Sequence, residues 1–108
     1  MYRLVILPIA KKDIREAASW YESKQDGLGK RFTLHVRNQL NSFKRNPYRF
    51  INRYGETRTM VLDVFPFMAH YIINEPQKLI VIAAVLHTSR SPDIWKSGRS
   101  TDDEIDDL

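Results

Sequence analysis

The spacing of hydrophobic residues along the chain changes twice, and each change marks a different kind of element. Residues 2–7 form a short apolar run that Pro8 ends, which predicts a strand. From Ile9 the apolar positions recur every three or four residues, as on one face of a helix, until the glycines of QDGLG interrupt the pattern. Two such helices joined by a short break are expected to pack as an antiparallel hairpin. The second helical series ends near Pro47 and consists of Leu28, Phe32, Val36, Leu40 and Phe43.

After Pro47 the hydrophobic residues alternate with polar ones, which is typical of strands. Four such runs follow one another with short connections, so we expect an antiparallel meander. The last run is almost entirely apolar and is expected to be a central strand covered on both faces. The pattern predicts an α+β fold in the order β-α-α-β-β-β-β, in which the helical hairpin packs on one face of a small antiparallel sheet. The four runs are YRFINRY, RTMVLDV, FMAHYII and KLIVIAAVL.

Length and composition fit one domain that folds without covalent cross-links. The chain has 108 residues and no cysteine, which excludes disulfides and thiolate metal sites and fits a reducing cytosol. The first apolar run is too short and is followed, not preceded, by lysines, so it does not resemble a signal peptide. No apolar run approaches the length of a membrane span. We therefore expect a cytoplasmic protein with no membrane partner.

Charge is divided unevenly along the chain. Residues 100–108, STDDEIDDL, hold five acids and no base, so residues 1–99 keep 17 basic and 8 acidic side chains, a net charge of +9. This surplus attracts anionic partners such as nucleic acid or an acidic protein, or it serves solubility alone. We expect residues 1–99 to form the folded domain and residues 100–108 to be a solvated tail that folding does not need. The alternative is that this tail lies on the basic face and competes with the target.

A histidine and several arginines stand where the predicted strands begin or end. His87 ends the last strand and Arg90 follows it, while Arg58 and Tyr71 belong to the second and third late strands. A metal-free ribonuclease needs a base, cations for the phosphate and an acid for the leaving oxygen. His87, Arg58 or Arg90, and Tyr71 fit these roles. The alternative is that His87 is a structural, hydrogen-bonded histidine and that Trp95 anchors the chain after the last strand.

The remaining motifs that would indicate an enzyme are absent from the sequence. The three histidines do not have the spacing of HxH or HExxH, and there is no cysteine to ligate a metal. No glycine-rich phosphate loop and no GxSxG motif occur. We therefore predict neither a metal nor a cofactor.

Several segments together resemble the RelE/ParE superfamily of bacterial toxins, the toxin halves of type II toxin–antitoxin pairs, often called plasmid stabilization proteins. The resemblance covers residues 1–99 in order and implies a small antiparallel sheet with an N-terminal helical hairpin, in agreement with the order read from the pattern. The run FPF…HY…AVLH..R.P..W is its specific part. The segments are DIREAASWYES, GLGKRF, RTMVL, FPFMAHY, IVIAAVLHTSRSPDIW and the final Arg99.

The resemblance implies one of two activities. RelE-like members are metal-free ribonucleases that cut messenger RNA on the ribosome, whereas ParE-like members bind DNA gyrase and block replication without catalytic residues. The Trp-Tyr pair, FPF and LHTSRSPDIW are closer to ParE, and RFINRYGETR offers arginines but not the lysines of RelE-like enzymes. We favour a gyrase inhibitor neutralised by an antitoxin, with no enzymatic activity. The alternatives are a ribonuclease and a member that only binds its antitoxin.

The favoured interpretation assigns two sets of binding residues. The strand-end cations and His87 are expected to contact the target: Arg53, Arg58, His87, Arg90 and Arg99. The helical hairpin is expected to contact the antitoxin through Trp20, Tyr21, Phe32 and Val36.

Overall fold

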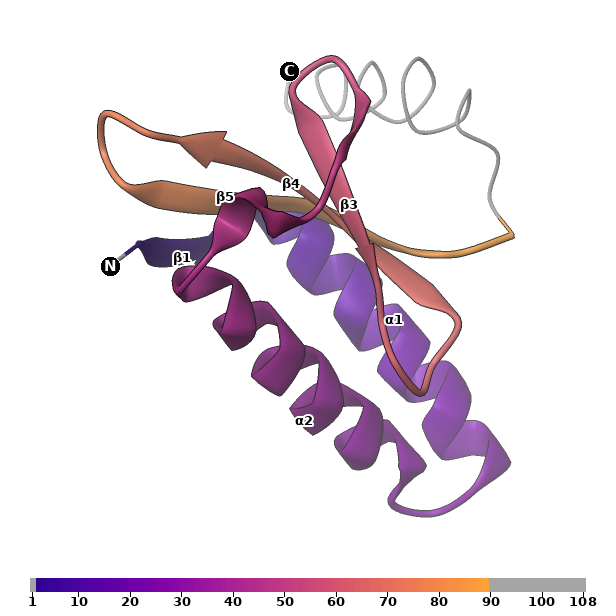
Figure 1. Ribbon diagram of the computed structural model, residues 1–108. Coiled ribbons are helices and arrows are strands. Elements are labelled where there is room, and N and C mark those ends of the chain that lie inside the picture. The colour runs from indigo at the N-terminus through magenta and orange to yellow at the C-terminus, as the bar shows by residue number, and fades with distance from the viewer. Residues whose placement is uncertain (1, 90–108) are drawn as a thin grey trace, which may run out of the picture.

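The computed structural model describes residues 2–89, and these confirm the predicted order of elements (Figure 1). The predictions for Arg90, Trp95, Arg99 and residues 100–108 fall outside the described residues. The elements are β1 (Arg3–Ile6), α1 (Pro8–Lys24), α2 (Leu28–Asn41), the 3-10 turns η1 (Ser42–Lys44) and η2 (Pro47–Arg49), β2 (Asn52–Tyr54), β3 (Thr57–Val61), β4 (Phe67–Asn74) and β5 (Leu79–His87).

The five strands form one mixed sheet in the order β1-β5-β4-β3-β2. Strands β2 to β5 are antiparallel neighbours, which confirms the predicted meander. Strand β1 pairs in parallel with β5, so β5 is an interior strand as its apolar sequence predicts. The pairing of β1 joins residues far apart in the chain, and hydrophobic alternation carries no signal for it.

The two helices lie side by side and cover one face of the sheet (Figure 1). Phe32, Val36 and Leu40 of α2 are buried and belong to the same core cluster as Ile80 and Ile82 of β5. A smaller cluster of Met68, Ala84 and Leu86 is separate from this core and has Tyr54 packed against it. The predicted helical stripe is therefore the face that α2 turns toward its own sheet.

The break between the helices is closed by a side chain of α1. The Glu22 carboxylate accepts hydrogen bonds from the backbone N–H groups of Gly27 and Gly29, both at 2.9 Å, and so caps the start of α2. A Cβ atom at Gly29 would lie 2.5 Å from the carbonyl oxygen of Ala18, so only glycine lets the helices approach this closely. This contact fixes the packing of α2 against α1.

One predicted strand is shorter in the structure than the sequence indicates. YRFINRY was expected to be extended throughout, but Pro47–Arg49 form a 3-10 turn and only Asn52–Tyr54 pair with β3. The cause is that side chains take the backbone carbonyl groups of this segment. Tyr71 donates its hydroxyl to the carbonyl of Pro47 at 2.7 Å, and Arg58 donates to the carbonyl of Phe50.

Candidate functional site

Of the described members of the predicted catalytic set, Arg58 and Tyr71 lie together and His87 lies apart. Arg58 and Tyr71 are cross-strand neighbours on β3 and β4. His87 is the cross-strand neighbour of Phe67, four residues before Tyr71 on β4. Because a strand rises about 3.3 Å per residue, that separation is about 13 Å along the sheet. His87 is therefore well separated along the sheet from Arg58, whose guanidinium group is held by two backbone carbonyl oxygens.

Tyr71 lies in the core and not at a surface. Its side chain is fully buried, its ring stacks on Phe43 with 4.4 Å between ring centroids, and its hydroxyl donates to Pro47. Burial raises the pKa of the Tyr71 hydroxyl to about 12, against a smaller opposing effect of the nearby arginines. A phenol in this position does not suit the proton donor predicted from the sequence.

Arg58 is held by the segment that precedes β2. Its guanidinium group lies over the Tyr48 ring, 5.0 Å from the centroid, and donates hydrogen bonds to the carbonyl oxygens of Phe50 and Tyr48. With Asn52 and Asn74 it also lines a surface hollow at this end of the sheet. Arg58 therefore fixes the turn after α2, and this structural role was not predicted from the sequence.

We expect Arg58→Ala to lower the free energy of unfolding by about 1–3 kcal/mol, because two carbonyl groups lose their charged donor. Arg45→Ala is the matched control, since Arg45 is exposed directly after η1 and its replacement should cost less than about 0.5 kcal/mol. Denaturant melts of the two variants measure the difference. Equal stabilities would show that Arg58 is free for a partner, as the sequence suggested.

The other predicted target-binding residues within the described range, Arg53 and His87, are exposed. Arg53 donates from Nε to the Thr59 hydroxyl at 3.3 Å. His87 Nδ1 accepts a hydrogen bond from the backbone N–H of Ser89 at 3.1 Å, which places the proton of the neutral ring on Nε2. This bond matches the structural alternative for His87, and it leaves the Nε2 edge as the part that a partner could contact.

A carboxylate ties the start of β1 to the β4–β5 turn. Glu75 accepts hydrogen bonds from Lys78, from the Tyr48 hydroxyl and from the Tyr2 hydroxyl, the last at 2.7 Å. These three donors lower the pKa of Glu75 to about 2. The hydrogen bond to Glu75 is also the main reason that the pKa of Tyr48 is raised to about 12.

We expect this cluster to make stability depend on pH. The pKa of Glu75 is lowered on folding, so its contribution is complete above the ordinary carboxyl value of 4.5 and is lost as the pH falls toward 2. Glu75→Gln should therefore be less stable than the parent at pH 7, and the difference should shrink between about pH 4.5 and 2. Thermal melts of both proteins over this range measure it. A difference that stays constant with pH would contradict the assignment.

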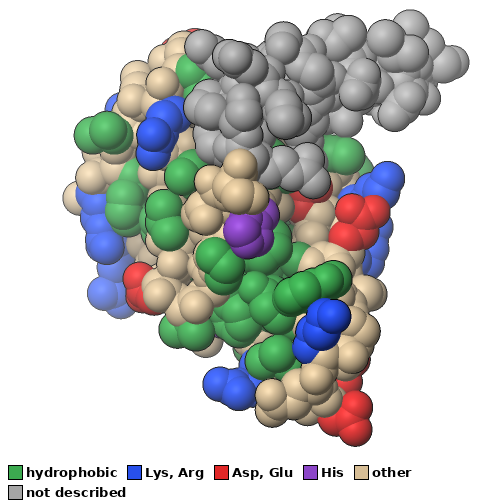
Figure 2. Space-filling model, turned by 90° about the vertical axis from the view of Figure 1, so that its right-hand side faces the viewer, with side chains coloured by type: hydrophobic (Ala, Val, Ile, Leu, Met, Phe, Trp, Pro, Cys, Tyr) green, Lys and Arg blue, Asp and Glu red, His purple; other side chains and the backbone are tan. Residues whose placement is uncertain are grey.

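An aromatic row runs from α1 to the end of β5. Trp20 meets Tyr21 with 5.1 Å between ring centroids, Tyr21 meets Phe67 at 6.1 Å, and Phe67 meets His87 at 5.3 Å. The two ends of the row are exposed, with Trp20 at 58%. The C-terminal half of α1 and the end of β5 lie on the right-hand side of Figure 1, and Figure 2 shows hydrophobic side chains gathered beside a histidine on that side.

The predicted antitoxin-binding residues divide into two groups. Phe32 and Val36 are 0% and 1% exposed and belong to the core, and Tyr21 packs between Phe32 and Phe65. Trp20 alone among the four is open to a partner over most of its surface. Phe32 therefore cannot touch a partner directly, and its replacement would affect antitoxin binding only by destabilising the fold.

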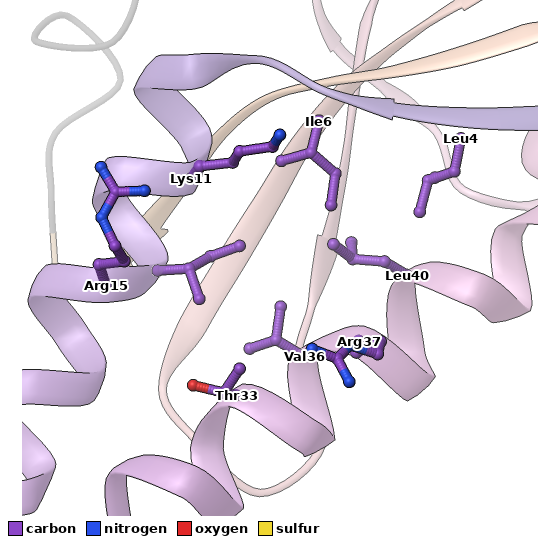
Figure 3. A pocket seen from close by; sticks show the side chains of 9 residues that line it. Leu4, Ile6, Lys11, Arg15, Thr33, Val36, Arg37 and Leu40 are labelled. Carbon is purple, nitrogen blue, oxygen red and sulfur yellow. The ribbon is translucent and has the colours of Figure 1, made fainter.

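A groove between β1, α1 and α2 was not predicted from the sequence (Figure 3). Its floor is apolar, and three cations stand at its rim: Lys11 and Arg15 of α1 and Arg37 of α2. The only sequence signal was the placing of Lys11 and Arg15, four residues apart, around Ile14 on one helix face. The residues that line the groove are Leu4, Ile6, Lys11, Ile14, Arg15, Thr33, Val36, Arg37 and Leu40.

Residues 2–89 contain no cluster of three histidine, cysteine, aspartate or glutamate side chains that could hold a metal ion. Within the same range, neither helix is long and apolar enough to span a bilayer. The features that remain as candidate sites in this part of the chain are the aromatic row and the groove.

Residues 2–89 thus form a small α+β domain with an exposed aromatic row and a groove that cations flank. Residues 4–92 match the family described as the ParE toxin of the type II toxin-antitoxin system, parDE, and the chain belongs to this family. It is a toxin of the type II toxin–antitoxin class within the RelE/ParE superfamily. No curated protein sequence matches the chain.

Solved structures share the fold at low sequence identity. The chromosomal ParDE toxin–antitoxin system of P. aeruginosa aligns with a TM-score of 0.70 and 18% identity, over 82% of this chain and 98% of that one. The intact E. coli RelBE toxin–antitoxin complex aligns with a TM-score of 0.64 and 15% identity, over 83% of this chain and 100% of that one. The isolated E. coli RelE toxin aligns with a TM-score of 0.62 and 13% identity, over 94% of this chain and 99% of that one. Both branches of the superfamily therefore resemble this fold.

Proposed function

We propose that the chain stops bacterial growth by binding DNA gyrase in the cytoplasm, without catalysis, and that a cognate antitoxin neutralises it. The observation that carries this proposal is that the predicted catalytic residues within residues 2–89 do not form one accessible site. Tyr71 is in the core, Arg58 is bound to backbone carbonyls, and His87 lies about 13 Å along the sheet from Tyr71. Membership of the ParE family supports the same choice over a ribonuclease.

The aromatic row is the surface that best suits a protein target. Tryptophan is among the residues that contribute most to protein interfaces, because it buries a large area with few rotatable bonds. Trp20 is 58% exposed, and the Lys24 ammonium lies 5.1 Å from the centroid of its ring, so the row presents an apolar surface with a cation beside it. We assign the gyrase contact to His87 and to Trp20, which the sequence had suggested as an antitoxin contact, with the predicted Arg53, Arg90 and Arg99 supplying positive charge.

The groove is the surface that best suits the antitoxin. An antitoxin segment that folds on binding needs apolar anchors to offset its ordering entropy, and acids to match a basic toxin. The groove offers both an apolar floor and the cations Lys11, Arg15 and Arg37. The RelBE structure is itself a toxin–antitoxin complex of the same fold, which supports an antitoxin partner for this chain.

Expression of the chain alone in a bacterial host tests the proposal. We expect growth to stop and the incorporation of labelled thymidine to fall before the incorporation of labelled amino acids, since a gyrase inhibitor blocks replication first. The opposite order would contradict the proposal and favour the ribonuclease. Normal growth with soluble protein present would favour a member that only binds its antitoxin.

A further inference from the structure

The groove has a chemistry that selects its occupant. Leu4 and Ile6 of β1 face Val36 and Leu40 of α2 across a hollow of about 240 Å³, and Lys11 reaches over it toward Ile6 (Figure 3). All the charged side chains that line the hollow are cations. The matching ligand is a short peptide that carries apolar side chains between several carboxylates.

The chain carries such a peptide at its own C-terminal end. Residues 100–108, STDDEIDDL, contain five acids, no base, and two apolar residues, Ile105 and Leu108, three positions apart. We infer that residues 100–108 occupy the groove of the same molecule, with Ile105 and Leu108 on the apolar floor and the acids beside Lys11, Arg15 and Arg37.

The connection between the domain and these residues is long enough for this contact. The backbone N–H of Val85 in β5 donates to the Asp13 carboxylate of α1 at 2.9 Å, so β5 ends beside the helix that carries Lys11 and Arg15. From Ser89 to Ile105 the chain has about 16 residues, which can span roughly 50 Å when extended. The path from β5 to the neighbouring helix is far shorter than this reach.

Because residues 100–108 belong to the same chain as the groove, even a weak contact is sufficient to keep the groove occupied. A segment tethered in the same chain as its site, through a connection of this length, experiences an effective concentration in the millimolar range. A peptide that binds the groove with a dissociation constant of about 0.1 mM would then occupy it in roughly nine molecules of ten. A competing ligand would find only the remaining tenth open, so its apparent affinity would fall about tenfold.

The regulatory consequence depends on the proposed antitoxin site, whereas the occupancy itself does not. If the antitoxin uses the groove, it must displace residues 100–108. A higher concentration of antitoxin is then needed to neutralise the toxin. The experiments below detect occupancy without any toxin activity. Their outcome is therefore independent of whether the chain binds gyrase.

Paramagnetic broadening in the full chain tests the contact directly. The sequence has no cysteine, so Ser100→Cys gives one nitroxide site next to the acidic segment. We expect strong broadening of the methyl signals of Val36 and Leu40, and weak broadening of Ile51, which is 75% exposed and precedes β2, at the opposite edge of the sheet from β1. The double variant Ile105→Ser/Leu108→Ser keeps every charge and should abolish the difference. Equal broadening at Val36 and Ile51 would overturn the inference.

A mixing control decides between one molecule and two. Isotope-labelled protein without nitroxide is mixed with nitroxide-labelled protein without isotope, so that only contacts between copies broaden the signals. We expect no broadening of Val36 in this mixture. Broadening there would mean that the segment binds a second copy, which would overturn the contact within one molecule.

Peptide competition supplies a second readout. A fluorescein-labelled peptide of residues 100–108 should bind the Ile105→Ser/Leu108→Ser chain about tenfold more tightly than the parent chain, whose groove is already occupied. Adding Arg37→Glu to the double variant should remove this binding. Equal affinity for the parent and the double variant, or no binding to either, would overturn the inference.

Discussion

Phe32→Ala should lower the free energy of unfolding by about 3–5 kcal/mol, the usual effect of deleting a large aromatic side chain from a core. Phe32 is fully buried, and its ring meets those of Tyr21, Phe65 and Phe67 at 5.0–5.2 Å between centroids. Alanine would leave a cavity where the helices meet the sheet. A loss of this size is a large part of the stability of a typical domain.

Leu34→Ala is the matched control for Phe32→Ala. Leu34 lies two residues further along α2 but is 44% exposed, so its replacement should change the free energy of unfolding by less than about 0.5 kcal/mol. Guanidinium unfolding curves compare the two variants. If Phe32→Ala were as stable as Leu34→Ala, Phe32 would be available for antitoxin contact, and its assignment to the core would be wrong.

Trp20→Ala should weaken gyrase inhibition by about 30-fold or more, while leaving the melting temperature nearly unchanged. Removing a tryptophan from the centre of an interface typically costs at least about 2 kcal/mol of binding free energy, which corresponds to that factor. The expected change in stability is small because Trp20 is 58% exposed and contacts mainly the edge of Tyr21 and the Lys24 side chain.

Ile51→Ala tests whether any exposed apolar side chain would have the same effect. Ile51 is 75% exposed and lies before β2, away from the aromatic row. Its replacement should leave both inhibition and stability unchanged. If Trp20→Ala inhibits gyrase as well as the parent does, or if Ile51→Ala loses inhibition equally, the aromatic row is not the contact surface.

The elements of the fold were predictable because each has a local signal. The stripe that contains Phe32 and Val36 indicated α2, and the apolar run before His87 indicated an interior strand. The strand after Pro47 was predicted too long because the alternation begins before it, whereas Tyr71 and Arg58 bind carbonyl groups of the preceding turn. Such side-chain contacts link distant positions and leave no periodic signal.

The candidate sites were harder to predict for the same reason. The stripe of α2 singled out Phe32 and Val36 but not the direction they face: both are buried, and Val36 also lines the groove. Trp20 was predicted as an antitoxin contact because it stands beside the stripe of α1 and not within it. The groove is assembled from β1, α1 and α2, and its side chains become neighbours only when the helical hairpin packs against β1.

A comparison of two purified systems tests the central claim most directly. The protein is added to a gyrase supercoiling reaction and, in parallel, to ribosomes that carry messenger RNA. The proposal predicts that supercoiling is inhibited at concentrations that leave the messenger intact. Cleavage of ribosome-bound messenger RNA with normal supercoiling would contradict it and would identify the chain as a ribonuclease.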